Sequence, residues 1–463
     1  MSDTPSSTVR ARELLAQDGM VNILVLGSGG REDALTAKLL ESPRAGVVTV
    51  APGNGGMIDR ADAGTLFDIK NAKTTVAMVK RLGADLVVIG PEDPLVLGVA
   101  DALRHAGIPT FGPNGGAAHI EGSKSFAKEV MERAGVPTAA YRAFRNDERK
   151  QAEAYVRELD LPVVIKADGL AAGKGVVVAT TLDEALEALD TCYSGKLGLA
   201  GQAVVVEEFL RGPEVSMLCL TDGKTVVPLA TSQDHKRALE GDKGPNTGGM
   251  GVYSPVPFVT DEELAQMEDI MRRVVKQLDD DGRTFSGCLY GGFMLTKDGP
   301  KVLEFNARFG DPETQVILPR MKADLLKVFL QIEAGQLDEA EIDWSDDYAV
   351  SVVLTSAGYP DKYETGKLIT GVEEADALEG VTVYHAGDKM HMENPPQKPS
   401  DPVGEEFLVT SGGRVLDVTA VAPTFEEART RAYEACELIK FEGKTLRRDI
   451  GERALRGRDA WEI

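Results

Sequence analysis

The sequence has few cysteines, and they lie far apart. The four are Cys192, Cys219, Cys288 and Cys436, and no two of them form a CxxC pair. Such spacing suggests neither a disulfide framework nor a zinc site. It is typical of a protein in a reducing compartment, so we expect a cytoplasmic location.

Long hydrophobic runs and an excess of positive charge are also missing. No apolar run approaches the roughly 20 residues that span a bilayer, and residues 1–20 lack the apolar centre of a secretory signal. The formal net charge of -23 repels the phosphate backbone of nucleic acids. We therefore expect no membrane insertion and no nucleic-acid partner, and a phosphorylated ligand would need a local pocket of lysines or arginines.

The 463 residues, 43% of them hydrophobic, can bury several cores, so about three or four domains are expected. Apolar runs at 21–26, 46–50 and 85–89 each end in a turn rich in glycine or proline. Helix-like spacing follows the first run, which predicts a parallel α/β domain with its ligand edge at the carboxyl ends of the strands. Further strands are predicted at 163–166, 176–178, 204–207, 214–220, 291–295 and 302–305, with a helix near 262–277 and a last α/β region from about 348 to 451.

The glycine turn at 27–30 is similar to a dinucleotide-binding motif without matching it. The fingerprint G-x-G-x-x-G would need glycine at position 32, where the carboxylate of Glu32 would repel a pyrophosphate. NAD binding is therefore disfavoured. The turn can still hold a single phosphate at the N-terminus of the following helix, or it can serve only as a tight turn.

A second glycine turn, 168–175, is similar to a Walker loop but has one residue too few before Gly173 and Lys174. Gly175 also stands where that loop carries the Ser or Thr that binds magnesium. Because a strand follows, we predict a mobile loop whose backbone and Lys174 fold over phosphates, with Lys166 as a second cation. A solvated loop tip is the alternative.

The segment 303–308 alternates strictly between polar and apolar residues. In a strand, this alternation places the following three on one face: Glu304, Asn306 and Arg308. It places these three on the other: Leu303, Phe305 and Ala307. Oxygen ligands such as Glu304 and Asn306 suit Mg²⁺ or Mn²⁺, and Arg308 suits an acyl or phosphoryl oxygen. An exposed sheet face would alternate in the same way, but the polar continuation at 309–315 favours a functional site.

The segment 233–251 has too many charges and glycines for a core element and no helical periodicity. We interpret it as a long loop that closes over an anionic substrate. Its charged residues Asp234, Lys236 and Arg237 are the candidate contacts. A solvated surface loop is the alternative interpretation.

Together, these segments resemble the glycinamide ribonucleotide synthetase family of ATP-grasp enzymes. The resemblance covers nearly all of the chain after Met20 and is carried by 27–32, 121–128, 163–178, 207–210, 233–251, 303–315, 410–414 and 447–451. One departure is Asp33, where the family usually has histidine. The resemblance implies a multidomain α/β and α+β fold with a polar N-terminal extension (1–19), a Rossmann-like domain (20–122), an ATP-grasp module (123–345) and a C-terminal domain (346–463). The module divides into a small nucleotide-binding subdomain with the hinge (123–210) and a metal and substrate subdomain (211–345).

The resemblance also implies roles for individual residues. ATP would be bound by Lys124, Lys166, Gly173, Lys174, Gly175, the hinge residues Glu207 and Leu210, and Glu214 near the ribose. The metal ligands would be Glu304 and Asn306. Phosphoribosylamine would be bound near Gly29, Gly30, Glu92 and Arg414. The catalytic groups would be Lys174, Arg308 and Asp234, with Asp234 orienting the ammonium of glycine.

The implied activity is a step of purine synthesis. Glycine is joined to 5-phosphoribosylamine while ATP is cleaved to ADP and phosphate, through a glycyl phosphate, with Mg²⁺ or Mn²⁺ as the cofactor. We expect a monomer or a weak homo-oligomer. Two alternatives remain open: another carboxylate-amine ligase or carboxylase on the same scaffold, and a nucleotide-binding regulator without catalysis.

Overall fold

The computed structural model describes residues 6–170, 175–195, 203–393 and 405–457. Its first sheet is parallel, with the order β3-β2-β1-β4-β5, and confirms the predicted α/β arrangement. The strands are β1 (Val21–Gly27), β2 (Ala45–Pro52), β3 (Asp62–Ala63), β4 (Leu86–Ile89) and β5 (Thr110–Phe111). The helices that follow them are α2 (Gly30–Leu40), α3 (Ala72–Leu82), α4 (Glu92–Val96), α5 (Val99–His105) and α6 (Gly115–Gly122).

A helix lies within the stretch that the sequence presented as a polar extension. This helix, α1 (Ser7–Ala16), is capped by the Ser6 hydroxyl. Ala11 is fully buried, and Arg12 donates a hydrogen bond of 3.0 Å to the carbonyl of Ala334 in α12 (Leu325–Ala334). Only a small side chain is fully buried, which explains why the helix gave little apolar signal in the sequence.

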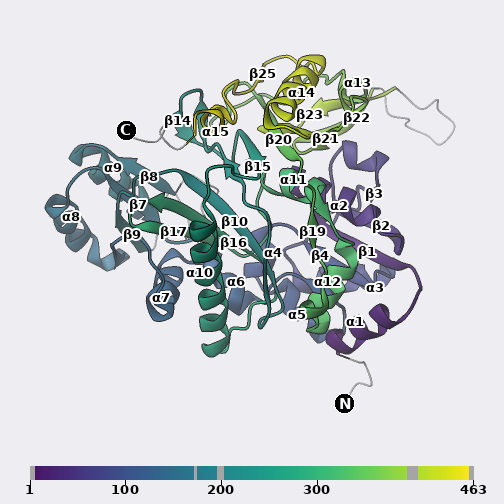
Figure 1. Ribbon diagram of the computed structural model, residues 1–463, viewed down its shortest axis with the longest axis horizontal. Coiled ribbons are helices and arrows are strands. Elements are labelled where there is room, and N and C mark those ends of the chain that lie inside the picture. The colour runs from purple at the N-terminus through teal and green to yellow at the C-terminus, as the bar shows by residue number, and fades with distance from the viewer. Residues whose placement is uncertain (1–5, 171–174, 196–202, 394–404, 458–463) are drawn as a thin grey trace.

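A small antiparallel sheet with the order β6-β9-β7-β8 has a core of its own. Its strands confirm those predicted at 163–166, 176–178 and 204–207. They are β6 (Tyr141–Arg145), β7 (Val163–Ala167), β8 (Val176–Ala179) and β9 (Ala203–Glu208). Its helices are α8 (Arg149–Glu158) and α9 (Leu182–Tyr193), and α7 (Lys124–Ala134) precedes it. In Figure 1, α8 and α9 form one end of the molecule.

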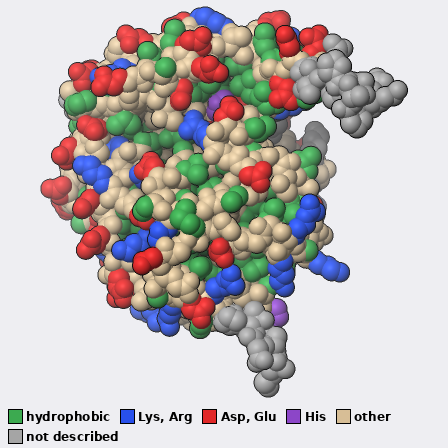
Figure 2. Space-filling model, turned by 90° about the vertical axis from the view of Figure 1, so that its right-hand side faces the viewer, with side chains coloured by type: hydrophobic (Ala, Val, Ile, Leu, Met, Phe, Trp, Pro, Cys, Tyr) green, Lys and Arg blue, Asp and Glu red, His purple; other side chains and the backbone are tan. Residues whose placement is uncertain are grey.

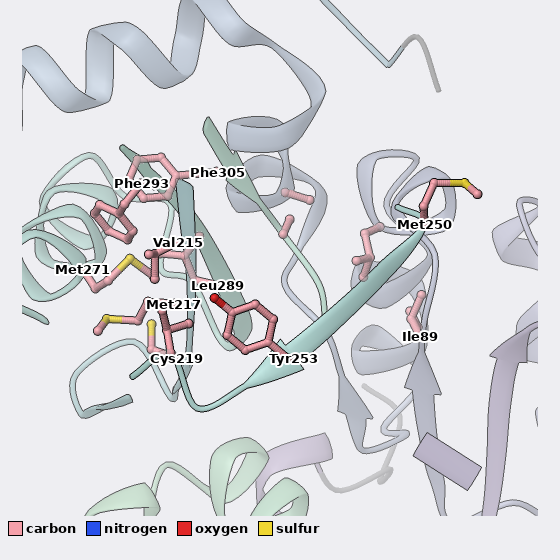
Figure 3. Close-up of a cluster of buried hydrophobic side chains, with 14 of the residues drawn as sticks. Ile89, Val215, Met217, Cys219, Met250, Tyr253, Met271, Leu289, Phe293 and Phe305 are labelled. Carbon is pink, nitrogen blue, oxygen red and sulfur yellow. The ribbon is translucent and has the colours of Figure 1, made fainter. Parts of the chain in front are cut away.

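The next sheet, with the order β11-β10-β16-β17, is also antiparallel. It consists of β10 (Glu214–Thr221), β11 (Val226–Pro228), β16 (Gly287–Thr296) and β17 (Gly299–Asn306). The predicted helix is α10 (Asp261–Asp280), which packs against this sheet. Figure 3 shows Val215, Met271 and Phe293 packed together beside Phe305, so one face of β17 is fixed against the core.

The segment 233–251 contains three short strands and the first residue of a fourth, and it is joined to the C-terminal region, which the sequence did not indicate. Its ends lie in the sheet β12-β15-β20-β24-β21. These strands are β12 (Gln233–Asp234), β15 (Gly251–Ser254), β20 (Tyr348–Ser356), β24 (Arg414–Ala422) and β21 (Val381–His385), and β25 (Lys444–Thr445) also pairs with β20. Between the ends, β13 (Arg237–Leu239) and β14 (Lys243–Asn246) form a hairpin. Residue 233 pairs with 253, which places both ends of the loop side by side.

The remaining elements are short, apart from α14 (Phe425–Leu438), which packs on β20 and β24. They are η1 (Gly56–Asp59), η2 (Asn146–Glu148), α11 (Thr314–Ile317), η4 (Leu318–Arg320), β18 (Met321–Lys322), η5 (Leu337–Glu339), β19 (Asp343–Trp344), α13 (Val372–Asp376), β22 (Asp388–Met392), β23 (Glu406–Thr410) and α15 (Glu452–Arg456). Within the described part of the chain, no helix combines the length and apolarity needed to cross a membrane. On the face shown in Figure 2, acidic and basic side chains are interspersed.

Candidate active site

Glu304 on β17 lies among three lysines from three separate elements. Lys236, from the loop after β12, has its Nζ 3.3 Å from Glu304 Oε1. The side chain of Lys166 reaches the same strand, where its Nζ donates a hydrogen bond of 3.0 Å to the Leu303 carbonyl. Lys236 first, and then Lys166 and Lys124, lower the pKa of Glu304 to about 2 against the opposing effect of burial. Four residues that the sequence proposed from different motifs therefore share one electrostatic cluster.

The residues of this cluster fit a divalent cation that is shared with a phosphorylated ligand. Glu304 is ionised and 36% exposed, and the half-buried Asn306 follows two positions along the strand. Among the described residues, no group of three or more His, Cys, Asp or Glu side chains is arranged to hold a metal by itself. Mg²⁺ commonly has few protein ligands and completes its shell with phosphate oxygens and water. The donor set therefore suits a metal that enters with a nucleotide.

The carboxylate of the predicted hinge residue Glu207 forms ion pairs with two lysines. Its Oε1 lies 3.1 Å from Lys128 Nζ and its Oε2 lies 2.9 Å from Lys166 Nζ. Burial lowers the pKa of Lys128 to about 8. Lys128 was missed by the sequence reasoning, although it ends one of the segments that carry the resemblance. The side chain of Glu207 therefore holds Lys128 and Lys166 in place.

Leu210, the second predicted hinge residue, belongs to an apolar group on the site side of the large sheet. It clusters with Ala139, Met294 and Leu303. The expectation that Leu303 faces the same core as Phe305 is wrong. The register between β16 and β17 shifts between Gly292 and Phe293, which interrupts the alternation of side chains at Leu303. The result is an apolar wall next to Lys166.

A small cavity lies beside the cluster and is lined by Glu214, Ser216, Asp234, Lys236, Tyr290, Gly292 and their apolar neighbours. Burial, and then the charge of Glu313, raise the pKa of Asp234 well above its ordinary value. Asp234 Oδ1 accepts no hydrogen bond within the described part of the chain. A carboxylate in this state would be stabilised in its ionised form by a ligand ammonium.

Two polar side chains of this cavity, Ser216 and Tyr290, were not proposed from the sequence. Ser216 Oγ lies 2.8 Å from the Tyr290 hydroxyl and donates to Glu313 Oε1 at 3.1 Å. Both lie on strands that read as ordinary apolar segments, so the sequence offered no signal for them. Glu313 belongs to the polar turn after β17, which did offer one.

Arg308 is held between two carboxylates. Its Nη2 lies 2.8 Å from Glu121 Oε1, and its Nε lies 3.4 Å from Glu92 Oε2. Glu121 also accepts the backbone N–H of Ala307 at 2.7 Å. Burial raises the pKa of Glu121 to about 6, although the nearby Arg308 opposes this effect. The structure thus brings the predicted residues Glu92 and Arg308 together in a direct ion pair. Glu121, the second partner of Arg308, was not singled out by the sequence reasoning.

The glycine turn before α2 is closed by its own glutamate. Glu32 Oε2 accepts the N–H of Ser28 at 3.2 Å and that of Gly29 at 2.7 Å. A Cβ at Gly30 would lie 1.9 Å from Asp417 Oδ2, so only glycine fits there. Glu32, whose carboxylate disfavoured a pyrophosphate in the sequence, therefore accepts the backbone N–H groups that a pyrophosphate would use.

Arg414 on β24 reaches the same region from the C-terminal sheet. Its Nη2 lies 3.1 Å from Asp311 Oδ2, and its Nη1 donates to the Gly248 carbonyl at 2.7 Å. A Cβ at Gly29 would lie 3.2 Å from Asp311 Oδ2. The structure therefore places both Gly29 and Arg414 next to Oδ2 of Asp311.

Three regions of the chain match the three domains of phosphoribosylglycinamide synthetase: the N domain over residues 21–121, the ATP-grasp (A) domain over 122–314 and the C domain over 349–453. A phosphoribosylamine–glycine ligase of Brucella melitensis is 45% identical over 436 residues, which cover 94% of this chain and 98% of that protein. The chain belongs to the phosphoribosylglycinamide synthetase family. A relative of the same name from Agrobacterium fabrum is 46% identical over 94% of this chain and 99% of its own.

The solved structures agree with the membership of this family. The crystal structure of a phosphoribosylamine–glycine ligase from Thermotoga maritima has a TM-score of 0.78 and 33% identity, and it covers 93% of this chain and 100% of that one. A biotin carboxylase from Campylobacter jejuni has a TM-score of 0.69 at 14% identity, covers 92% of this chain and 93% of that one, and shows the fold alone. The resemblance inferred from the motifs is thereby confirmed.

Some of the site residues expected for this family lie apart or outside the described residues. Lys174 and Gly173 lie outside them. Gly175 directly precedes the return strand β8, and its carbonyl accepts the N–H of Ala167 at 2.7 Å, which confirms that the glycine turn connects two strands. Arg237 donates to the Gly244 carbonyl of its own hairpin at 2.7 Å. Its contact with substrate stays a prediction.

Proposed function

We propose that this protein ligates glycine to 5-phosphoribosylamine, with ATP cleaved to ADP and phosphate, and thereby forms glycinamide ribonucleotide in purine synthesis. The observation that carries the proposal is the cluster of Glu304 with Lys166 and Lys236 beside the Asp234 cavity. It occurs in a chain that matches relatives named phosphoribosylamine–glycine ligase over 94% of its length.

The nucleotide would lie between the small and large antiparallel sheets. Lys124 and Lys166, with Lys174 and the backbone of Gly173 and Gly175, would bind its phosphates. Leu210 would contact the base, and Glu214 would contact the ribose. Glu304 and Asn306 would hold Mg²⁺ or Mn²⁺, which, when bound, neutralises negative charge on the reacting phosphate.

The chemistry follows from the weakness of a carboxylate as an electrophile. An oxygen of the glycine carboxylate attacks the γ-phosphorus of ATP, and ADP leaves, which gives glycyl phosphate. The amine of phosphoribosylamine then attacks the carbonyl carbon and loses a proton, and phosphate leaves. Asp234 would orient the glycine ammonium, while Lys236 and Arg308 would stabilise negative charge on oxygen. The glycyl phosphate must be shielded from water, which is a task for the segment 233–251.

Phosphoribosylamine would bind where the first and last domains meet. Gly29, Gly30, Glu92 and Arg414 are the proposed contacts. The shared position of Gly29 and Arg414 beside Asp311 supports this assignment. Arg414 belongs to the C-terminal sheet, so this site requires both domains.

The test is product formation by the purified protein with ATP, Mg²⁺, glycine and freshly generated phosphoribosylamine. We expect one ADP for each glycinamide ribonucleotide, measured by a coupled ADP assay and mass spectrometry, and little ADP when either substrate is omitted. ADP release with a different acid and amine, but not with this pair, would contradict the proposed substrates. ATP binding without turnover of any pair would favour a regulator.

A further inference from the structure

His235 lies between the two proposed glycine contacts, Asp234 and Lys236, but it has a different environment. Successive side chains of an extended segment point to opposite sides, so His235 points away from the cavity that its neighbours line. It is buried, its Nδ1 lies 3.1 Å from the Gly251 carbonyl, and its Nε2 accepts the N–H of Gly451 at 3.1 Å. The ring therefore attaches the loop to the C-terminal segment 447–451.

Arg447 attaches the same segment to the β13–β14 hairpin. It is only 2% exposed. Its Nη1 donates to the Arg237 carbonyl and to Asp242 Oδ1, both at 2.9 Å. Its Nε and Nη2 donate to the two oxygens of Asp449 at 2.8 Å each. Asp449 Oδ2 also accepts the N–H of Gly241 at 2.8 Å, so both Arg447 and Asp449 contact the hairpin.

The segment 447–451 is itself fixed to helix α14. Tyr433 accepts the N–H of Ile450 at 3.1 Å and donates to the Arg447 carbonyl at 2.8 Å. Arg429 donates to the Ile450 carbonyl at 2.7 Å. In Figure 1, β14, β15 and α15 lie together next to the C-terminal layer. Hydrogen bonds thus connect α14, through the segment 447–451, to His235 and to the hairpin that follows it.

We propose that His235 and Arg447 are positioning residues of the ligation reaction, through which the C-terminal domain holds Asp234 and Lys236 in the glycine site. The inference rests on the proposed function and adds a role for the 447–451 segment. Neither residue lines the cavity: His235 points away from it, and Arg447 contacts the hairpin at the Arg237 carbonyl and Asp242. Their effect on catalysis would come only through the position of the loop.

The first test compares Arg447→Met with Arg448→Met in the full-length protein. The two arginines are adjacent, but the side chain of Arg448 is 61% exposed. For Arg447→Met we expect a KM for glycine raised at least about tenfold, more than one ADP per product, and a KM for ATP within about twofold of wild type, since a misplaced loop exposes the acyl phosphate to water. Arg448→Met should match the wild type in all three. Equal changes in both KM values, or equal behaviour of the two variants, would overturn the inference.

A milder variant, Asp242→Asn, keeps the test decisive if Arg447→Met does not fold. Asp242 has a φ of 52°, a conformation that asparagine also tolerates, and the change removes one charge from the Arg447 contact. Its control is Lys243→Gln, an exposed position on the same hairpin. We expect Asp242→Asn to raise the KM for glycine at least about threefold over its control. No difference would overturn the inference, whereas a wild-type protein that makes no product would overturn the proposed function and this inference with it.

Discussion

Lys236 Nζ lies 3.3 Å from Glu304 Oε1, so the loop after β12 and the strand β17 share an ion pair. Glu304 is also the proposed metal ligand, and a divalent ion on its carboxylate would compete with Lys236 for the same oxygens. Metal binding would then release the lysine toward the cavity, where negative charge develops during the reaction. The position of the loop and the occupancy of the proposed metal site would therefore be coupled.

Replacing Lys236 tests two expected effects of its ion pair with Glu304, one on turnover and one on the Mg²⁺ requirement. We expect Lys236→Met to lower turnover at least about tenfold, because it removes a cation from the reacting oxygens. It should also lower the Mg²⁺ concentration needed for half-maximal activity, because the competing cation is gone. Both are measured by ADP release over a Mg²⁺ titration. Lys243→Met, at an exposed position of the same hairpin, is the control and should change neither quantity. An unchanged Mg²⁺ requirement in Lys236→Met would contradict the competition.

Glu304→Ala tests the metal ligand directly. The side chain is 36% exposed, so its loss should leave the fold intact while turnover falls at least about tenfold. Raising the concentration of Mg²⁺ or Mn²⁺ should restore part of the activity of Glu304→Gln, which keeps one oxygen ligand, but not that of Glu304→Ala. Asp298→Asn, on the exposed turn between β16 and β17, is the control. Near-normal turnover of Glu304→Ala at low metal concentration would show that Glu304 is not a metal ligand.

Local patterns in the sequence predicted those parts of the structure that depend on neighbouring residues. The strand with Glu304 and Asn306 was found from its alternation, and the parallel sheet was found from its apolar runs. The departure at Leu303 arises from a shifted register between β16 and β17, which no single-strand pattern reveals. The pairing of β15, at the end of the loop, with β20 joins residues about 100 positions apart, and the sequence carries no local signal for such a contact.

The lack of local signals for long-range contacts also explains why Glu121 was not predicted as a partner of Arg308. The sequence indicated a guanidinium beside the metal ligands, but it did not show Glu121 as its buried partner. Glu121 belongs to α6, and only the tertiary fold brings that helix to β17. Motifs thus predicted which residues carry charge at the site, whereas the fold decides which charges neutralise one another.

The pair of Arg308 and Glu121 can be tested by a double-mutant cycle. Arg308→Met leaves a carboxylate that is only 5% exposed without its cation, and we expect a loss of roughly 3 kcal/mol in the free energy of unfolding. The double variant Arg308→Met/Glu121→Met should lose less than the sum of the two single variants. Thermal and urea denaturation measure the difference, with Arg133→Met at the half-exposed pair with Asp281 as the control. Strictly additive losses would show that the pair contributes no coupling.

The pH dependence of stability should separate His235 from His385. Burial, and then the charge of Arg447, lower the pKa of His235 to about 4, while Asp242 and Asp449 oppose this effect. The unfolded chain takes up the proton near pH 6.5, so the stabilising contribution of neutral His235 is complete above that pH and is lost as the pH falls toward 4. The full loss is roughly 3 kcal/mol, at 1.36 kcal/mol for each pKa unit.

His385 should show the opposite sign. Burial alone would lower its pKa, but the hydrogen bond of 2.6 Å between its Nδ1 and Asp388 Oδ2 and the charge of that carboxylate raise the pKa on balance. Its contribution is therefore present below pH 6.5 and is lost as the pH rises through the raised value. Melting temperatures between pH 5 and 8 measure both effects. His235→Asn should lose most stability, relative to wild type, at the alkaline end, because neutral His235 stabilises the fold there, and His385→Asn should lose most at the acid end. Parallel curves for the two variants would contradict the opposite protonation states of these two histidines.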